Sequence, residues 1–402
     1  MATAAAHVFD DVIPTRAELT ARARAMIPAL KARSAAAIAA RRIPAETIRE
    51  MREAGFFKIL QPKRWGGYEM DPQAFFDVQM ALAEGCMSTA WVFGVVGCHN
   101  FQMGLFDLRA QEDVWGSDTN VLISSSYQPV GKVEKVEGGF LLSGRWGFSS
   151  GCEHCDWVFL GSIIWPETPD GVPDMRTFLL PRKDYKIVEN WDTFGLQATG
   201  SHDIVVEKAF VPEYRTHRAM DGFMGTNPGR AANDGPLYKL PWAQIFVRSV
   251  STAAIGATQA ALDAYLDVAK ARVSTNTGKA TRENPIALVA AAKVQSAIDE
   301  MKVVLENSFA TMMTAMREGR ELPMADRIRY RYQSSQIGRR CADLVDELVP
   351  LLGGRAIYMD SPILRCWLDI NASRAHVAND PNLIGQTLGG MYVGQQPMDT
   401  FV

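Results

Sequence analysis

The 402-residue sequence lacks long apolar runs, a strong charge excess and a dense set of cysteines. No uninterrupted apolar run reaches the roughly 18 residues that a membrane helix needs, so we expect no membrane span. Basic and acidic side chains nearly cancel (42 against 45, net charge −3), whereas nucleic-acid binding needs a strongly basic face. Six cysteines are too few for a disulfide framework. Because the first residues show no basic segment followed by an apolar one, we predict a cytoplasmic protein.

Common nucleotide and metal motifs are missing as well. No G-x-G-x-x-G follows a strand and no G-x-x-x-x-G-K-[ST] occurs, so a nicotinamide or ATP site of the common kinds is not expected. One C-x-x-C is present, formed by Cys152 and Cys155. A structural zinc site needs four ligands, and His154 could supply only a third. A thioredoxin-like motif would begin a helix, whereas this one precedes the strand-like DWVFLGSII. We therefore expect no metal, and we keep a redox role as the weaker alternative.

Residues 1–117 are predicted to form a helical domain. They contain Ala-rich and apolar segments with few helix breakers, and Pro44 stands where a first helical turn tolerates proline. Ser88 is expected to cap the last long helix. The predicted helices cover residues 15–35, 44–51, 71–84 and 88–105.

Residues 240–402 are predicted to form a four-helix bundle. Apolar residues recur every three or four positions from Val294 to Met316, and again from Ile337 to Leu348. This spacing is the period of a helix with one apolar face. Together with residues 248–272 and 362–379, these segments supply the four helices of a bundle.

Between the helical parts, residues 118–219 have the texture of a β domain. Their short β-branched and aromatic segments are separated by Gly, Pro and Asp clusters, which indicates a small barrel or sandwich. Residues 220–239 form a polar, Gly-rich connection. Because loops of this length are usually functional in compact proteins, we regard it as a candidate lid. The predicted fold class is therefore α+β, with an N-terminal α domain, a middle β-barrel domain and a C-terminal bundle.

The stretch RWGFSSGCEHCDW, residues 145–157, combines rings and hydroxyls beside the C-x-x-C. Trp146 and Phe148 could form an aromatic wall. Ser149 and Ser150 could donate hydrogen bonds to a flat heterocycle, or they could simply cap a turn.

Two histidines and a run of serines are further candidates. His99 follows Trp91 and Val95 at helical spacing, which places it on an inward helix face. An inward histidine is more often a core residue with a satisfied hydrogen bond than a catalyst, and the same holds for His376. Residues 124–126 are three serines in a strand-like segment, where alternate hydroxyls face one side.

Three longer stretches resemble the acyl-CoA dehydrogenase family. They are GLQATGSHDIVVEKAFVP (195–212), RSVSTAAIGATQAALDAYLDVAKAR (248–272) and LLGGRAIYMDSPILRCWLD (351–369). The order of helical, β and bundle parts agrees, so the resemblance covers essentially the whole chain. It implies the acyl-CoA dehydrogenase-like fold.

The sequence departs from that family at the catalytic base. Most members carry a Glu that removes the α-proton of a thioester, and Val377 in NASRAHVAND stands about where that Glu should be. The alternative base position, in PWAQIFVRS, is not acidic either. A valine cannot accept a proton, so dehydrogenation of an acyl-CoA has no evident base.

The sequence is instead similar to the oxygenase components of two-component flavin-dependent phenol hydroxylases built on this fold. The matching runs are GFFKILQPKRWGG, STAWVFGVVGCHN, ISSSYQPVG, GRWGFSSGCEHCDW, WDTFGLQATGS and RAHVANDP. By this resemblance, Ser150 lies near flavin N5 and His376 near the flavin C4a edge. His99 and Ser125 face a substrate phenol.

The resemblance also implies a set of cofactor contacts and partners. Arg248 lies where the fold contacts flavin phosphates, and Gly353 and Gly354 let the backbone approach the cofactor of another subunit. We therefore expect a homotetramer, and a separate NAD(P)H-flavin reductase that supplies reduced flavin. The remaining expected flavin contacts are Trp146, Phe148, Ser149, Ser150, Thr199 and Ser201.

The implied reaction uses reduced FMN or FAD and O2. A C4a-hydroperoxyflavin would hydroxylate an aromatic substrate, in particular a phenol, ortho to its hydroxyl. Two alternatives remain open: an acyl-CoA dehydrogenase with a relocated base, and an N-, S-, indole or polyketide oxygenase on the same fold. The sequence does not choose between FMN and FAD.

Overall fold

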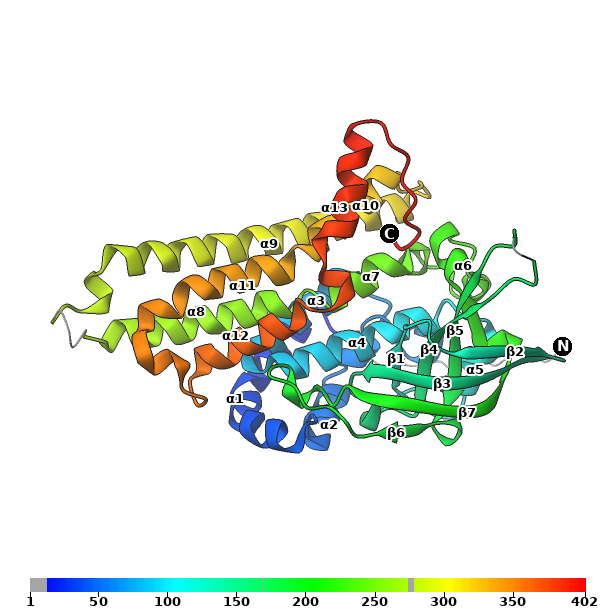
Figure 1. Ribbon diagram of the computed structural model, residues 1–402, viewed down its shortest axis with the longest axis horizontal. Helices are drawn as coiled ribbons and strands as arrows, with labels where there is room; N and C mark the ends of the chain where they lie inside the picture. Colours follow the sequence, from blue (N-terminus) through cyan, green and yellow to red (C-terminus); the bar gives the residue numbers. More distant parts are fainter. Residues whose placement is uncertain (1–12, 169, 274–277) are drawn as a thin grey trace.

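The computed structural model describes residues 13–168, 170–273 and 278–402. Its helical and β parts follow the order predicted from the sequence (Figure 1). Helix α4 runs through the middle, between the strands and the helices of the bundle (Figure 1). The predicted α+β fold is confirmed.

From residue 13 onward, the described N-terminal part contains five α-helices. The longest begins with a capping box in which Thr15 accepts from the backbone N–H of Glu18, and the Glu18 carboxylate accepts from the backbone N–H of Thr15 (2.7 Å). The prediction that Ser88 caps the fourth helix is wrong, because Cys86 is its N-cap and the helix begins at Met87. The helices are α1 (Arg16–Ala40), α2 (Ala45–Glu53), α3 (Pro72–Gly85), α4 (Met87–Met103) and α5 (Leu108–Trp115).

Helix α4 is the central element of the molecule. Every residue from Met87 to Met103 is buried, and the helix contacts α3, α7, α8 and strand β1. A helix that is buried on all sides cannot leave a polar side chain unsatisfied without a free-energy cost. The side chains of His99 and Gln102 on this helix therefore require hydrogen-bond partners, from the protein or from a ligand.

The strands form two four-stranded sheets, ordered β1-β4-β5-β8 and β2-β3-β7-β6. Their inner faces share one apolar core, to which Phe140, Leu160, Phe178 and Ile204 belong. Within the described residues the two sheets are hydrogen-bonded separately, so the middle domain, predicted as a small barrel or sandwich, is a sandwich. The strands are β1 (Ile123–Ser126), β2 (Lys132–Val136), β3 (Gly139–Ser149), β4 (Trp157–Ile164), β5 (Asp174–Pro181), β6 (Lys186–Val188), β7 (His202–Pro212) and β8 (Thr216–Arg218).

The segment 220–239 is more structured than the predicted loop. It contains most of helix α6 (Ala219–Met224) and two short 3-10 turns. The backbone N–H of Gly229 donates to Leu105 O, Asn233 Nδ2 donates to Gly104 O, and the Tyr238 hydroxyl donates to Leu60 O. These bonds attach the segment to the N-terminal helices, so opening it as a lid would require breaking them.

The C-terminal part contains the predicted bundle, made of α8, α9, α11 and α12, which pack on one another. Helices α10 and α13 project from one side of it (Figure 1). The helices are α7 (Trp242–Ser249), α8 (Ala253–Ala271), α9 (Pro285–Arg317), α10 (Met324–Ser335), α11 (Ile337–Leu348), α12 (Pro362–Ser373) and α13 (Pro381–Tyr392).

One stretch, Trp242–Ala271, is long and apolar enough to cross a membrane by length and composition. It comprises α7 and α8, and 94% of its most apolar window is buried inside the protein. Burial of this kind is what the core helix of a soluble protein shows.

Candidate functional site

One face of α4 gathers the first part of the site. Trp91, Val95, His99 and Gln102 follow one another at helical spacing and therefore share a face. This face meets strand β1 and helix α7, because α4 packs on both. The inward position predicted for His99 is thus the one observed.

His99 is fully buried and presents one nitrogen without a protein partner. Its Nδ1 lies 2.6 Å from the carbonyl oxygen of Ile123. A carbonyl only accepts, so Nδ1 carries the proton and Nε2 is left as an acceptor. Nε2 has no hydrogen-bond partner among the described residues. Burial lowers the pKa of His99 to about 4, against a smaller opposite effect of the Ile123 carbonyl, so the ring is neutral at physiological pH.

The serine run splits between two faces of β1, as alternation requires. Ser124 and Ser126 are buried, and the Ser124 hydroxyl has no hydrogen-bond partner among the described residues. Ser125 points the other way, toward the hydroxyl of Tyr127, and the Tyr127 ring packs edge-on against His99 (6.1 Å between centroids). The structure therefore brings Ser125 and His99 to the same region.

His376 lies in the turn after α12 and has the opposite tautomer. Its Nδ1 accepts a hydrogen bond from the backbone N–H of Ala378 (3.1 Å), so the proton of the neutral ring is on Nε2. Burial, and then the positive charge of Arg331, lower the pKa of His376 to about 4. The ring lies 5.9 Å from Trp91 and 6.0 Å from Phe246. His376 is therefore a neutral hydrogen-bond donor beside the α4 face.

Ser150 belongs to a directed chain of hydroxyl groups. The Thr199 hydroxyl donates to Leu196 O (2.9 Å) and lies 2.7 Å from Ser201 Oγ. Ser201 Oγ lies 2.7 Å from Ser150 Oγ, and the indole N–H of Trp91 donates to Ser150 Oγ (3.2 Å). Each hydroxyl has one proton, and the chain ends on a carbonyl, so every proton points toward Leu196. Ser150 Oγ therefore keeps one lone pair for a further N–H donor.

Phe148 stands in a strained backbone position at the end of β3. The pairing of β3 with β7 shifts register between Trp146 and Ser149, and Phe148 has φ 65°, which a bulky side chain rarely adopts. Its ring is 65% exposed and lies 6.0 Å from the ring of Trp191. Strain of this kind is concentrated at functional sites.

The expectation for Trp146 as a flavin contact is not supported by its position. Its ring is fully buried in the β-domain core, and its indole N–H donates to Gly161 O (2.8 Å). The register shift explains the difference, because an inserted residue reverses which side of the strand the following side chains face. Trp146 points into the sandwich, and Phe148 points out of it.

Ser149 is fully buried, and its hydroxyl has no hydrogen-bond partner in the described part of the chain. GFSSG, residues 147–151, also matches the letters of the G-x-S-x-G motif of hydrolases. His202 pairs with Ser149 across β3 and β7, but it cannot act as a base for the Ser149 hydroxyl. Its Nδ1 accepts from the backbone N–H groups of Asn190 and Trp191, and its Nε2 faces Glu153 at 3.6 Å. The pattern does not form a catalytic triad.

Arg248 is a buried cation without an anion. It is 2% exposed, and neither Nη1 nor Nη2 has a partner among the residues that the structure describes. Burial lowers the pKa of Arg248 to about 10. A buried guanidinium left unpaired is costly, so this position suits an anionic ligand.

Gly353 and Gly354 lie away from these residues, between α11 and α12 at the outer end of the bundle (Figure 1). Gly353 has φ 68°, and a Cβ there would meet the Arg272 guanidinium at 2.6 Å. Gly354 has open space around it. The structure therefore does not bring the two glycines to the site of their own chain.

The cysteine pair occupies a short 3-10 turn after β3. The thiol of Cys152 donates to Gly200 O and that of Cys155 to Gly151 O, and burial raises the pKa of both thiols. Within residues 13–168, 170–273 and 278–402, no group of three or more His, Cys, Asp or Glu side chains is arranged to hold a metal ion.

Sequence reasoning gave no role to several residues of the site. In the sequence, Trp91 only indicates which helix face carries His99. In the structure it contacts both Ser150 and His376. Tyr127 and Phe246 complete a row of rings between the two histidines. The helical spacing between Trp91 and His99 could have indicated that Trp91 belongs to the site. No sequence pattern indicates this for Phe246, which reaches the site only because α7 packs against α4.

These residues fit a flavin. The unpaired atoms of His99, Ser149 and Arg248, and the open lone pair of Ser150, provide both acceptors and donors for a polar heterocycle with an anionic part. The exposed ring of Phe148 offers an apolar surface. An acidic base is missing where the fold would place one, since Val377 is a 76% exposed apolar side chain.

Comparison with known proteins agrees with this geometry. Residues 14–112 match the family model "Acyl-CoA dehydrogenase, N-terminal domain", and residues 249–381 match "Acyl-CoA dehydrogenase, C-terminal domain". The chain is 38% identical to the flavin-dependent monooxygenase, oxygenase subunit HsaA of Rhodococcus jostii, over 95% of this chain and 100% of the relative. It is 30% identical to the FADH(2)-dependent resorcinol hydroxylase, oxygenase component of a Rhizobium species, over 89% of this chain and 90% of the relative.

A solved structure gives the same answer. The HsaA monooxygenase from M. tuberculosis superimposes with a TM-score of 0.91 at 36% identity, over 97% of this chain and 100% of the other. The chain belongs to the acyl-CoA dehydrogenase family. Within that family it is an oxygenase component of the flavin-dependent monooxygenases. The predicted fold, flavin dependence and oxygenase function are confirmed.

Proposed function

We propose that this enzyme hydroxylates a phenolic substrate ortho to its hydroxyl group, with O2 and with reduced FMN or FAD from a separate NAD(P)H-flavin reductase. The relatives named as oxygenase subunits or components support a separate reductase, and the resorcinol hydroxylase supports an aromatic substrate. The observation that carries the proposal is the buried, unpaired acceptor nitrogen of His99.

His99 suits a phenol because its acceptor is fixed in place. The Ile123 carbonyl holds the proton on Nδ1 and leaves Nε2 to accept a hydrogen bond from the phenol hydroxyl. With a pKa near 4, the ring is too weak a base to remove the proton from a resting phenol. The hydroxyl becomes far more acidic as the ring carbon gives up electron density, so the proton moves during the attack. Ser125 holds the same oxygen.

His376 and Ser150 act at the cofactor. Bound reduced flavin supplies the electrons that activate O2. Ser150 Oγ accepts a hydrogen bond from a flavin N–H, because its own proton is directed to Ser201. His376 Nε2–H donates to the oxygen that leaves. Because its pKa is near 4, His376 acts as a neutral donor, and the nearby charge of Arg331 disfavours the imidazolium.

Five further residues are proposed to form the flavin site. Phe148 lies against its ring, Ser149 hydrogen-bonds to it, and Thr199 and Ser201 keep Ser150 oriented. Arg248 offsets negative charge on the cofactor. The burial of His99 and Arg248 keeps water away from the reacting atoms, which favours oxygen transfer over release of peroxide.

The decisive experiment mixes the protein anaerobically with reduced FMN or FAD and then adds isotope-labelled O2 with a panel of phenols. The proposal expects one labelled oxygen atom in the product, next to the original hydroxyl, and less than one peroxide per O2 consumed. Quantitative peroxide with every phenol, together with bleaching of bound oxidised FAD by an acyl-CoA, would instead support dehydrogenation.

Replacing Ser150 by Ala is expected to accelerate peroxide release about tenfold, the effect of losing one hydrogen bond to a polar group. The faster release of peroxide should be seen with every substrate, because Ser150 faces the flavin and not the phenol. The measurement is the rate of peroxide formation without substrate. Ser162→Ala is the matched control, since this buried serine donates to Gly131 O inside the β domain (2.7 Å). Equal rates in wild type and Ser150→Ala would remove Ser150 from the cofactor site.

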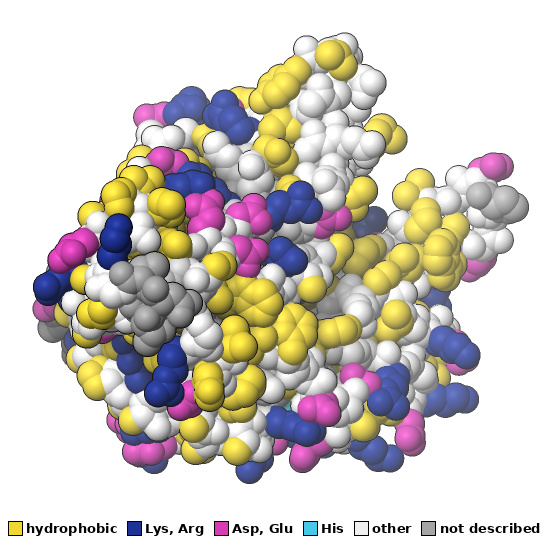
Figure 2. Space-filling view, turned by 60° about the vertical axis from the view of Figure 1, so that its left-hand side comes forward, with side chains coloured by type: hydrophobic (Ala, Val, Ile, Leu, Met, Phe, Trp, Pro, Cys, Tyr) yellow, Lys and Arg dark blue, Asp and Glu magenta, His cyan; other side chains and the backbone are white. Residues whose placement is uncertain are grey.

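The assembly proposed from the sequence is a homotetramer in the cytoplasm. Apolar side chains are exposed next to Gly353 and Gly354, at Ile357, Tyr358 and Met359. Hydrophobic side chains also gather on the face that brings the outer end of the bundle forward (Figure 2). Exposed apolar groups of this kind favour burial against another subunit.

A further inference from the structure

Gln102 is a buried amide whose N–H group has no partner. The residue is 1% exposed, and its Nε2 forms no hydrogen bond within the described part of the chain. The hydroxyl of Tyr127 donates to the other end of the amide, Oε1. Burial raises the pKa of Tyr127 well above its ordinary value, so this hydroxyl keeps its proton and Oε1 remains the acceptor. The unpaired group of Gln102 is therefore a donor, and the bond from Tyr127 holds it in one orientation.

The same tyrosine links Gln102 to His99. The Tyr127 ring lies edge-on to the His99 ring (6.1 Å between centroids), and its hydroxyl is bonded to Gln102. His99 and Gln102 are three positions apart on the buried helix α4, so their side chains are neighbours on one face. One of them presents an unpaired acceptor and the other an unpaired donor. Because unpaired buried groups are costly, the pair suits a ligand with a hydroxyl for His99 and an acceptor oxygen for Gln102.

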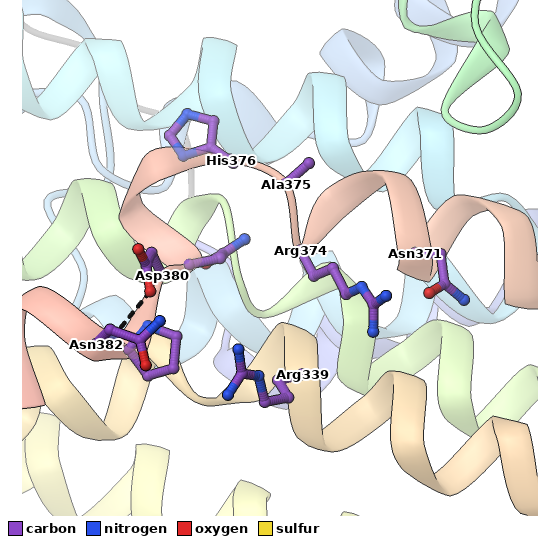
Figure 3. A pocket seen from close by; sticks show the side chains of 9 residues that line it. Arg339, Asn371, Arg374, Ala375, His376, Asp380 and Asn382 are labelled. Atoms are coloured by element: carbon purple, nitrogen blue, oxygen red, sulfur yellow. Dashed lines mark hydrogen bonds between the residues drawn. The ribbon is translucent and has the colours of Figure 1, made fainter.

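The order of side chains along α4 indicates which part of the ligand Gln102 meets. Two residues proposed to act at the flavin, Ser150 and His376, contact Trp91 at the other end of this face. The imidazole of His376 projects from the turn between α12 and α13 (Figure 3). A helix rises about 1.5 Å per residue, so His99 lies roughly 12 Å along the axis from Trp91, and Gln102 about 4.5 Å beyond His99. Gln102 is therefore farther from the flavin than the group that receives the reacting hydroxyl.

We propose that Gln102 determines substrate specificity, with its amide N–H donating to a second oxygen of the phenolic substrate on the side away from the flavin. This inference rests on the proposed phenol hydroxylation and deepens it. The substrate class is a phenol with a further acceptor oxygen on or beside its ring, in preference to a phenol with hydrocarbon substituents alone. A buried donor discriminates between the two, because a substrate without the oxygen leaves the N–H unpaired after water is excluded.

The test uses pairs of phenols that differ in one oxygen atom: a hydroxymethyl-phenol and the corresponding ethylphenol, with the substituent ortho, meta or para. The two members are of nearly the same size, but only the hydroxymethyl oxygen can accept from Gln102. The measurement is the ratio of their kcat/KM values, in the presence of reduced flavin and O2. For at least one pair, Gln102→Met should lower this ratio at least about tenfold, the effect of one hydrogen bond. Because the ratio compares two substrates in one protein, a general loss of activity cancels.

Gln61→Met is the matched control. Gln61 is equally buried, at 1% exposed, but its Nε2 already donates to Thr119 O (2.8 Å), so its replacement should leave the ratio within about twofold of wild type. The double variant Gln102→Met/Tyr127→Phe removes both partners of the buried hydrogen bond rather than one, which costs less stability. It should show the same loss of ratio, and it keeps the test decisive if the single variant does not fold.

Two kinds of result would overturn this role of Gln102. One is a ratio that stays at the wild-type value for every pair when Gln102 is replaced, and the other is an equal loss of ratio in Gln61→Met. If wild type hydroxylates none of these phenols, the proposed function fails together with this inference. Hydroxylation of both members with an unchanged ratio would remove Gln102 alone and leave the proposed function intact.

Discussion

Replacing His99 by Asn should lower phenol hydroxylation by about 10²- to 10⁴-fold, the usual contribution of a general base. The Asn side-chain N–H can still donate to the Ile123 carbonyl, but the acceptor of Nε2 is lost. O2 consumption should continue, because the flavin contacts are unchanged, and the oxygen should appear as peroxide. The measurement is the ratio of hydroxylated product to O2 consumed. His99→Ala should give the same ratio with lower stability.

His217→Gln is the matched control for this variant. His217 is also buried, and burial lowers its pKa as well, but its Nε2 is paired with Asn227 (2.7 Å). Its replacement should leave the ratio of product to O2 unchanged. If His99→Asn kept the wild-type ratio, His99 would have no role in the phenol's deprotonation. In wild type the ratio should not change between pH 5 and 8, because His99 titrates below this window.

The buried histidines should also make the protein less stable in acid. The folded-state pKa of His99 is about 4, below its ordinary value of 6.5, so the unfolded chain binds a proton first as the pH falls. Stability is therefore complete above pH 6.5 and is lost between pH 6.5 and 4. The full decrease in the free energy of unfolding is about 3 kcal/mol for one such histidine, and about 2 kcal/mol of it is lost by pH 5.

Two other groups modify this dependence. His376 has the same direction of pKa shift and adds to the loss. Asp369 acts in the opposite sense, because burial raises its pKa to about 6; its contribution is present at low pH and is lost as the pH rises through 6. Urea unfolding at pH 7 and pH 5 should give a smaller difference in His99→Asn than in wild type. Equal differences in the two proteins would show that His99 does not titrate with the lowered pKa.

Much of the architecture was accessible from the sequence because local patterns determine it. The apolar period from Val294 to Met316 belongs to one continuous helix, α9, and the β-branched segments of residues 118–219 became strands. The sequence did not reveal that the strands form two separate sheets, because edge pairing depends on contacts across the whole domain. The structure of residues 220–239 was missed because its anchors, such as Gly104 and Leu60, lie far away in the chain.

The site was predicted only in part, because local patterns indicate some of its residues and distant contacts determine the others. The helical spacing from Trp91 placed His99 on the inner face of α4, but its tautomer is set by the carbonyl of Ile123, 24 residues away. Trp146 and Phe148 are two residues apart and would share a face in a regular strand. The register shift before Ser149 separates them, and Gly147 between the two rings is a local signal for it, because a glycine inside a strand often marks a bulge.

The loop before β7 has a consequence for how the enzyme unfolds. Asp369 of α12 accepts from the backbone N–H of Leu196 (2.7 Å), and a Cβ at Gly195 would meet Leu368 O at 2.2 Å. The same loop supports Ser150 through Thr199, and Ser150 in turn is bonded to Trp91 of α4. The three parts of the chain are thus joined at one point by directional bonds. Heating should melt them together as one cooperative unit, with the catalytic contacts disappearing in the same transition.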